Sequence, residues 1–191
     1  ILLNKTGYTD LDIILSKSNT PLPVQLFEEL AQKKETLVLD VRTQQEFIKG
    51  HIPGAIFIGL NGSFAPWVGA LIADIKQPII LVAPEGRSKE AVTRLARVGY
   101  ENSLGYLKGG MTSWVKAGKT TSQIKSILAK EFEQEFKTKA VTVLDVRKDV
   151  EYNSEHLCGN NVHHISLESI NKKIDEIENQ TDYKNKNETG N

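Results

Sequence analysis

Apolar residues along the chain alternate between the spacing of helices and that of strands. Over residues 21–34 they mark one face of a helix behind a proline-rich start, and residues 36–41 form an apolar run typical of a buried strand. Further helices are predicted at 44–49, 88–98 and around Trp114, and further strands at 56–58, 79–82 and 100–107. This alternation predicts an α/β fold with a central parallel sheet flanked by helices on both faces.

A five-residue motif occurs twice, one domain length apart. Val-Leu-Asp-Val-Arg stands at residues 38–42 and again at residues 143–147, an offset of 105 residues. At that offset the copies also share a glutamate, a histidine and a glycine: Glu46 and Glu151, His51 and His156, Gly54 and Gly159. Such a repeat predicts two tandem copies of one α/β unit.

The second copy is predicted to be incomplete. It starts like the first, with a helix within 123–136 and a strand at 141–146, and a further helix is expected at 167–177. The offset then leads from Ala83 to a polar stretch near residue 188 that has no apolar strand. The predicted division is therefore a linker from an upstream domain at 1–20, a first unit at 21–118, a linker at 119–122 and a truncated second unit at 123–191.

Composition excludes several classes of partner. The 24 basic residues balance the 24 acidic ones, so no net charge attracts the chain to nucleic acid or to an anionic membrane. The longest apolar runs are strand-sized, well below the roughly 20 residues of a membrane helix. The one cysteine, Cys158, cannot form an internal disulfide, which fits a reducing compartment. We expect a cytoplasmic chain that binds neither nucleic acid nor membrane.

Several motifs, in the right order, resemble the rhodanese superfamily. They are Leu-Val-Leu-Asp-Val-Arg at 37–42, Glu46-Phe47, Gly-His-Ile-Pro-Gly-Ala at 50–55 and Leu-Lys-Gly-Gly-Met-Thr-Ser-Trp at 107–114. The resemblance implies a rhodanese-like fold in tandem, with the second copy incomplete. It also implies that the family's activity, sulfur transfer through a cysteine, is the activity to look for.

Two segments are similar to a narrower group. Residues 61–70 and 81–87 look like the rhodanese part of metallo-β-lactamase-fold/rhodanese fusions, which include persulfide dioxygenases. In those fusions the metal centre belongs to an amino-terminal domain, so the resemblance implies an upstream metallo-β-lactamase-fold partner domain and no cofactor in this chain. The start at Ile1 favours a fragment of a longer protein. Homo-oligomerisation is the other partnership considered.

The loop that would carry the sulfur lacks its cysteine. Rhodanese chemistry needs a thiolate at the head of a loop whose amides point inward at the start of a helix. The resemblance aligns the family's Cys-x-x-Gly-x-Arg with Ala83-Pro84-Glu85-Gly86-Arg87-Ser88, which puts Ala83 at the cysteine position and makes the loop one residue shorter. Since an alanine methyl cannot attack a sulfane sulfur, we predict no catalytic residue in the first unit.

Two interpretations of this loop stay open. Gly86, Arg87 and Ser88 lie at a predicted helix start, where amides, a guanidinium and a hydroxyl can converge on an anion, although Glu85 opposes this with a negative charge. Alternatively, the loop is only a tight connection with Ser88 as the helix cap.

Other polar and aromatic residues receive structural interpretations. Asp40 with Arg42 is expected to brace loops by ion pairing rather than to act in catalysis, and the same holds for Asp145 with Arg147. Residues 61–68 are expected to form a loop with exposed aromatic side chains. Phe64 and Trp67 in this loop are a candidate interface with the missing partner domain.

Cys158 is a weak candidate for chemistry. Its neighbours His156, His163 and His164 suggest a metal site, but no second close pair of ligands follows. By register Cys158 matches Pro53 and not the reactive loop. We interpret it as a semi-buried bystander and predict no metal site.

The leading functional hypothesis is a non-catalytic rhodanese-like module in a persulfide-handling fusion protein, used for docking, oligomerisation or binding of an anion or persulfide. The enzymatic alternative is a sulfurtransferase whose cysteine lies in the second unit's loop, absent from this chain.

Overall fold

The computed structural model describes residues 11–138 and 141–173, and the chain divides into two compact units, residues 1–126 and 127–191. Parts of the predicted linker (1–10) and of the predicted second unit (139–140 and 174–191) lie outside the described residues. The division falls later than the predicted residue 123 because the connecting segment is tied to the first unit. Ser122 and His51 exchange two backbone hydrogen bonds of 2.9 Å, and the amide of Ile124 donates to the Ile48 carbonyl at 3.0 Å.

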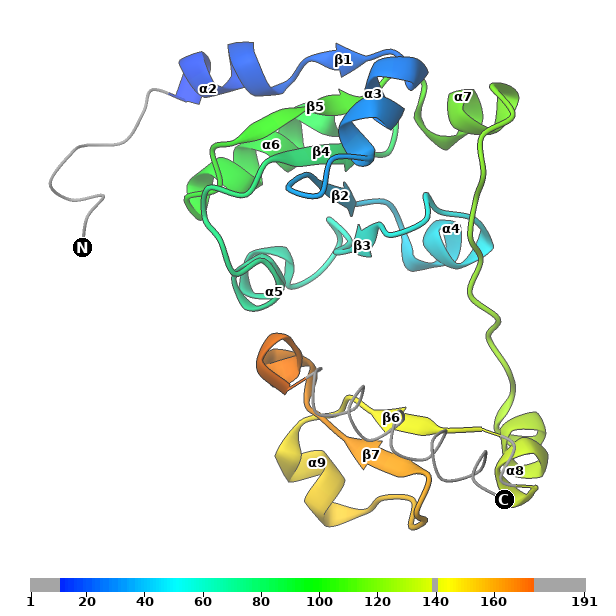
Figure 1. Cartoon of the computed structure of the whole chain (residues 1–191). Helices are drawn as coiled ribbons and strands as arrows, with labels where there is room; N and C mark the ends of the chain where they lie inside the picture. The colour runs from blue at the N-terminus through cyan, green and yellow to red at the C-terminus, as the bar shows by residue number, and fades with distance from the viewer. Residues whose placement is uncertain (1–10, 139–140, 174–191) are drawn as a thin grey trace, which may run out of the picture. The chain divides into compact units, whose positions relative to one another are not determined.

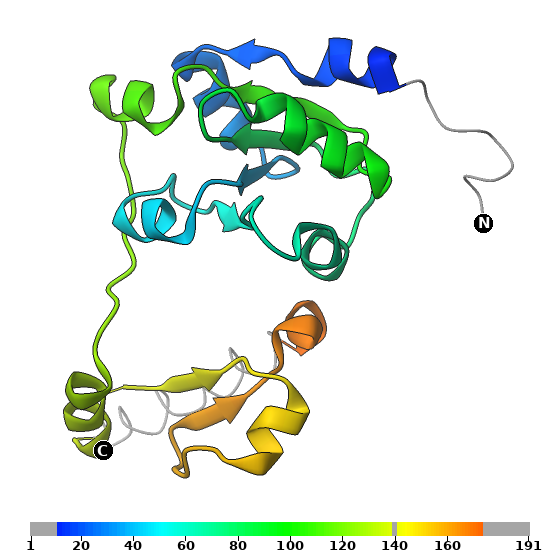
Figure 2. The same cartoon turned by 180° about the vertical axis from the view of Figure 1, so that it is seen from behind.

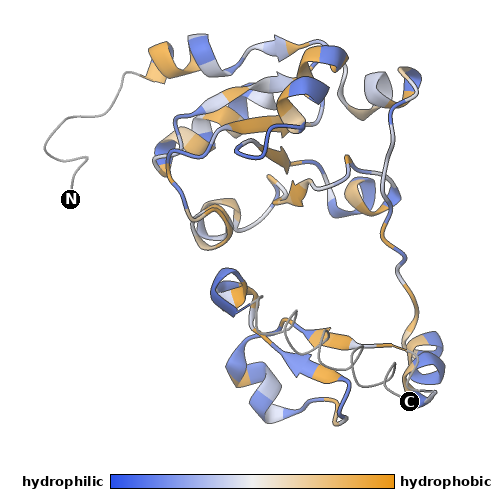
Figure 3. Cartoon of the chain, in the orientation of Figure 1, coloured by the Kyte–Doolittle hydropathy of each residue, from blue (hydrophilic) through white to orange (hydrophobic). Residues whose placement is uncertain are grey.

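A five-stranded parallel sheet forms the centre of the first unit (Figure 1). Its strand order is β1-β5-β4-β2-β3, with bounds β1 (Pro21–Leu22), β2 (Leu37–Asp40), β3 (Ile56–Phe57), β4 (Ile79–Val82) and β5 (Ser103–Leu107). The two central strands, β2 and β4, pair over their full length, with Leu39 opposite Leu81. All four β4 residues are buried, and Figure 3 shows the hydrophobic character of these strands. The predicted α/β fold with a central parallel sheet is confirmed.

Helices cover both faces of this sheet, as Figures 1 and 2 show from opposite sides. On one face the core includes residues of α2 (Leu11–Ser18), α5 (Phe64–Leu71) and α6 (Ser88–Arg97). On the other face it includes residues of α3 (Val24–Ala31) and α7 (Gly110–Lys116). The predicted inward side of α6 is confirmed by four buried residues, Ala91, Val92, Leu95 and Ala96. The short helix α4 (Gln44–Lys49) has the predicted bounds.

Part of the predicted linker is structured. Residues 11–18 form α2, whose Ile14 is buried in the core beside residues of α6. The prediction of a linker over residues 1–20 is therefore wrong for this segment. An apolar face of Leu11, Ile14 and Leu15 packs on the sheet because its burial stabilises the unit.

The predicted loop at 61–68 is also corrected, since α5 begins at Phe64. Phe64 is 0% exposed, packs in the core and lies under the Arg94 guanidinium, 4.9 Å from the ring centroid. Trp67 is partly buried against the same core. Phe64, Val68 and Leu71 have helical spacing that could have revealed the helix, and Pro66 is tolerated in its first turn. Phe64 therefore cannot serve as the predicted exposed interface residue.

The second unit is small and open. It contains α8 (Ala129–Lys137), β6 (Val143–Asp145), α9 (Asp149–Ser154), β7 (Val162–His164) and a 3₁₀ turn η1 (Leu167–Ser169). β6 and β7 form a parallel two-stranded sheet. Ile165 is the buried hydrophobic residue of its described part. Across both units, every helix in the described ranges is too short or too polar to cross a membrane.

Gly105 provides a test of the packing between β5 and the chain entering β1. Its φ is +142°, and an added Cβ would meet the Thr20 carbonyl oxygen and approach the Leu22 Cγ to 2.8 Å. Gly105→Ala is expected to lower the free energy of unfolding by about 2 kcal/mol or more, since both strain and overlap arise. Urea denaturation followed by circular dichroism measures this change.

Gly69→Ala is the matched control, because Gly69 lies inside α5 with open space around its Cα. This variant is expected to gain roughly 0.5–1 kcal/mol from helix propensity. Equal stabilities of the two variants would contradict the packing argument.

Candidate functional site

A pocket of about 720 Å³ opens at the carboxyl ends of the parallel strands, where open α/β sheets place their ligands. Three segments surround it: the end of β2 with the start of α4, the β4–α6 loop, and the end of β5 with the start of α7. Its lining residues are Pro21, Arg42, Glu46, Ala83, Pro84, Glu85, Gly86, Ser88, Tyr106, Leu107, Lys108, Gly109, Gly110, Met111 and Thr112. The structure thus brings most of the predicted loop residues together around one cavity.

The β4–α6 loop is a tight turn headed by Ala83. The Arg87 amide donates to the Pro84 carbonyl at 3.1 Å, and Gly86 adopts a left-handed φ of +74°, which favours glycine. Ala83 follows the fully buried Val82, lines the pocket and packs partly against the core. The side chain at the head of the loop is therefore an unreactive methyl group.

Arg87 lies away from the pocket, in contrast to the expectation that it helps to bind an anion. Its guanidinium donates to both carboxylate oxygens of Glu90 at 2.8 and 3.0 Å, and to the Asn61 Oδ1 at 3.1 Å. This pairing lowers the pKa of Glu90 and raises that of Arg87. Because α6 begins directly after the shortened loop, Arg87 becomes the N-cap residue and its side chain pairs along the helix.

Ser88 lines the pocket as predicted by the ligand-binding interpretation, but it is not the helix cap. The cap position belongs to Arg87, and no side chain makes a capping hydrogen bond there. The alternative that assigned this role to Ser88 is therefore corrected.

A buried ion pair braces the opposite wall of the pocket. Arg42 donates to both carboxylate oxygens of Asp40, with the shortest distance of 2.6 Å between Nη2 and Oδ2, and the same Nη2 donates to the Gly50 carbonyl at 2.8 Å. Asp40 is fully buried, so removal of either partner would leave a costly unpaired charge. The pair thus joins the end of β2 to the turn after α4.

Glu46 belongs to the same wall. The Thr43 backbone amide and hydroxyl both donate to its carboxylate, at 3.0 and 2.5 Å. These hydrogen bonds, more than the nearby charge of Arg42, lower the pKa of Glu46. The Arg42 guanidinium and the Glu46 carboxylate are therefore both already hydrogen-bonded to neighbouring groups of this wall.

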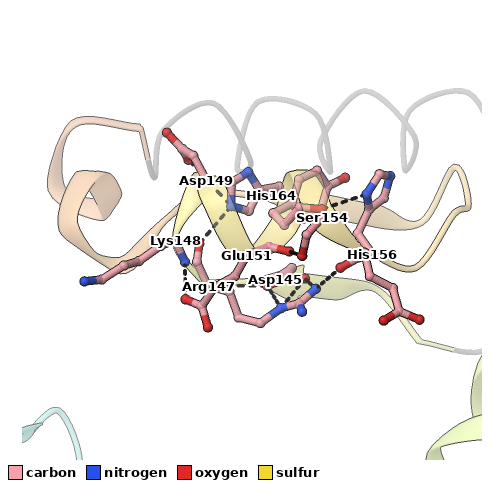
Figure 4. Close-up of polar contacts among 10 residues, drawn as sticks. Asp145, Arg147, Lys148, Asp149, Glu151, Ser154, His156 and His164 are labelled. Atoms are coloured by element: carbon pink, nitrogen blue, oxygen red, sulfur yellow. Dashed lines mark hydrogen bonds and ion pairs between the residues drawn. The ribbon is translucent and has the colours of Figure 1, made fainter.

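The second unit repeats this brace in atomic detail, as Figure 4 shows. Arg147 donates to both oxygens of Asp145, again with 2.6 Å between Nη2 and Oδ2, and to the Glu155 carbonyl at 3.0 Å. Glu155 stands 105 residues after Gly50, so the three partners keep their spacing. The hydrogen bonds from Arg147 lower the pKa of Asp145 from 3.8 to about 2.

The histidines near Cys158 serve the packing of the second unit. Tyr152 stacks on His156 and on His164, with ring centroids 4.2 and 3.9 Å apart. The His164 Nε2 lies 2.9 Å from the Arg147 carbonyl oxygen. Cys158 is exposed, which corrects the expectation of a semi-buried side chain. Within residues 11–138 and 141–173, no group of three or more His, Cys, Asp or Glu side chains is arranged to hold a metal ion.

One family profile and several known proteins are similar to this chain. The sequence profile of the rhodanese-like domain matches residues 23–117. The thiosulfate sulfurtransferase GlpE of Pseudoalteromonas translucida is 31% identical over 90 residues, which cover 47% of this chain and 82% of that protein. GlpE of Shewanella oneidensis is 29% identical over 97 residues, which cover 50% of this chain and 92% of that protein. The crystal structure of the Alr3790 protein from Anabaena sp. overlays with a TM-score of 0.49 and 21% identity, covering 59% of this chain and 99% of that chain.

The profile match lies entirely within the first unit and spans the strands and helices that surround the pocket, from the start of α3 to the end of α7. The GlpE relatives match over most of their own length. The chain therefore belongs to the family of rhodanese-like domain proteins.

Proposed function

We propose that the first unit is a non-catalytic rhodanese-like module that binds a ligand or docks a partner and requires no cofactor. The observation that carries this proposal is Ala83, which heads the loop at the pocket where sulfur transfer needs a thiolate. The loop is also one residue shorter than the family's pattern, and its arginine pairs with Glu90 outside the pocket. Two parts of the family's chemistry are thus missing from the same loop.

The wider context follows from the resemblance of residues 61–70 and 81–87 to metallo-β-lactamase-fold/rhodanese fusions. On this basis we place the chain in the carboxyl-terminal part of such a protein, acting in persulfide metabolism in the cytoplasm. An upstream metallo-β-lactamase-fold domain is then the first partner to test, and a further copy of the chain is the second.

The charges around the pocket favour weak anion binding. Arg42 is occupied by Asp40, so Lys108 is the remaining cationic side chain among the lining residues. Glu46 and Glu85 add two carboxylates to the same lining. A ligand of this pocket must therefore rely on loop amides and on Lys108, and Glu85 opposes any anion.

We also propose that the second unit is the start of a second rhodanese-like copy. The repeated brace and the parallel pairing of β6 with β7, which matches that of β2 with β3, support this assignment. The alternative function is that of a sulfurtransferase whose catalytic cysteine lies in the second copy's loop, which this chain does not contain. Its supporting observation is that Asp145 and Arg147 repeat the ion pair of Asp40 and Arg42, of which Arg42 lines the pocket of the first unit.

Thiosulfate provides the direct test of the first proposal, since it is the sulfur donor named for the GlpE relatives. The chain and its Cys158→Ser variant are both expected to turn over thiosulfate and cyanide at least about 1,000-fold more slowly than GlpE of Pseudoalteromonas translucida, because the nucleophile is absent. Thiocyanate formation is the readout. Turnover that survives Cys158→Ser would refute a silent first unit.

Glu85→Gln tests the charge argument for the pocket. Removing this exposed carboxylate is expected to tighten binding of inorganic phosphate by roughly two- to fivefold, the scale of an exposed charge pair. Amide chemical shifts of the loop residues measure the titration. Glu35→Gln is the control, because Glu35 is exposed and does not line the pocket. An equal effect of both variants would show that the phosphate senses only the overall charge.

The brace of the second unit predicts a pH dependence. The Asp145 carboxyl has a pKa of about 2 in the folded chain and 3.8 when it is unperturbed, as in the unfolded chain. Its ionised form therefore stabilises the unit above about pH 4, and this contribution is lost as the pH falls toward 2. Arg147→Gln is expected to return the pKa toward 3.8. A carboxyl-carbon NMR titration measures both values, and a wild-type pKa near 4 would contradict the ion pair.

A further inference from the structure

The two copies of Val-Leu-Asp-Val-Arg are identical in sequence but differ in burial. Leu39 and Val41 are each 0% exposed, whereas their counterparts Leu144 and Val146 are 37% and 40% exposed. One helix further on, Ile52 is 3% exposed and its counterpart Leu157 is 43% exposed. Since the residues at these positions remain apolar, the described part of the second unit presents the equivalents of core positions with exposed side chains.

The first unit shows what covers these positions. Leu39 pairs with Leu81 of β4, the Val41 amide donates to the Val82 carbonyl at 2.9 Å, and both side chains pack in the cluster that contains Val92 and Leu95 of α6. β4 with its loop and α6 is therefore one continuous segment that covers this strand, together with residues of α2 and α5 in the same cluster.

The corresponding edge of β6 is open in the described structure. β6 pairs with β7 alone among the described strands, whereas β2 pairs with both β3 and β4. The Leu37 amide donates to the carbonyl of Pro78, just before β4, and the Val41 amide donates to Val82 of β4, both at 2.9 Å. The counterpart amides of Thr142 and Val146 donate to no other described backbone group. An edge with unpaired amides and exposed apolar side chains is a template for an added strand.

We propose that this edge, formed by the side chains of Leu144 and Val146 and the amides of Thr142, Leu144 and Val146, binds a strand–loop–helix polypeptide segment of the same chemistry as β4–α6. The added segment supplies a strand of consecutive apolar residues parallel to β6, and an amphipathic helix that covers Leu144 and Val146. This inference rests on the assignment of the second unit as a rhodanese-like copy. A second copy of the folded chain does not supply the segment, because its β4 is already enclosed between β2 and β5.

The added segment would also complete a pocket. In the first unit Arg42 and Glu46 face the β4–α6 loop across the cavity. Arg147 and Glu151 hold the equivalent positions, with Arg147 braced by Asp145 and Glu151 accepting from the Lys148 amide at 3.3 Å. The loop of the bound segment would lie beside this preformed wall, so the residue at the head of that loop determines the chemistry of the completed site.

The chain's own residues 77–98 are a suitable probe, because in the first unit this segment pairs with the strand that carries the same five-residue motif as residues 143–147. A synthetic peptide of this sequence is added to the full chain. The exchange rates of the Leu144 and Val146 amides with solvent are then expected to fall by at least roughly tenfold. The Val143 amide, already bonded to the Asn161 carbonyl at 2.8 Å, serves as an internal reference.

Two variants locate the binding. Leu144→Lys in the chain is expected to weaken binding by at least about 30-fold, as for a hot-spot side chain. Val150→Lys is its matched control, since Val150 lies on α9 with 81% exposure and should leave binding unchanged. A Leu81→Lys peptide should lose binding as well, and this change leaves the folding of the chain untouched.

Three results would overturn the proposal: no protection of residues 144 and 146 at saturating peptide, equal binding by Leu144→Lys and wild type, or protection of β6 by self-association without peptide. The readout is binding and not turnover. Sulfur transfer by the first unit would therefore contradict the proposed function without contradicting this inference.

Discussion

The pairing of β4 with β2 is the contact on which the molecule depends. All four residues of β4 are buried, and they contribute to the cores on both faces of the sheet, Ile79 and Leu81 on one and Ile80 and Val82 on the other. Its buried apolar area supplies much of the driving force for the first unit. The same strand delivers Ala83 to the edge of the pocket. The stability of the first unit and the position of its pocket therefore both depend on β4.

The pocket lies at the carboxyl ends of the parallel strands, beside a loop that begins with an alanine. The sheet, the glycine-dependent turns at Gly86 and Gly109 and the braced Arg42 build the cavity that the fold provides. The loop has a methyl group at its head, a carboxylate at Glu85 and an arginine directed to Glu90. The head of the loop therefore carries no thiol, and the carboxylates of Glu46 and Glu85 offset the charges of Arg42 and Lys108 in the lining. Fold membership and activity are separate conclusions for this reason.

The Asp–Arg brace shows how much local sequence can specify without a core. In both copies the aspartate ends a strand, the arginine follows two residues later and the guanidinium reaches a carbonyl eight residues further on. The brace forms in the first unit with its aspartate fully buried and in the second with its arginine largely exposed. Its geometry thus follows from strand, turn and spacing, and the environment decides only its electrostatic strength.

The sequence alone determined the elements whose signals are local. Helix 44–49, the strand at 79–82 and the inward face of α6 followed from local sequence patterns, and the alternation of strands with helices pointed to the parallel sheet. The tertiary structure decided the features that depend on long-range packing. It placed Phe64 in the core and α2 on the sheet, turned Arg87 toward Glu90, and left Leu144 exposed where the identical Leu39 is buried. The physical reason is that hydrogen-bonding pattern and spacing are encoded within a few residues, whereas burial depends on which distant segment arrives to cover them.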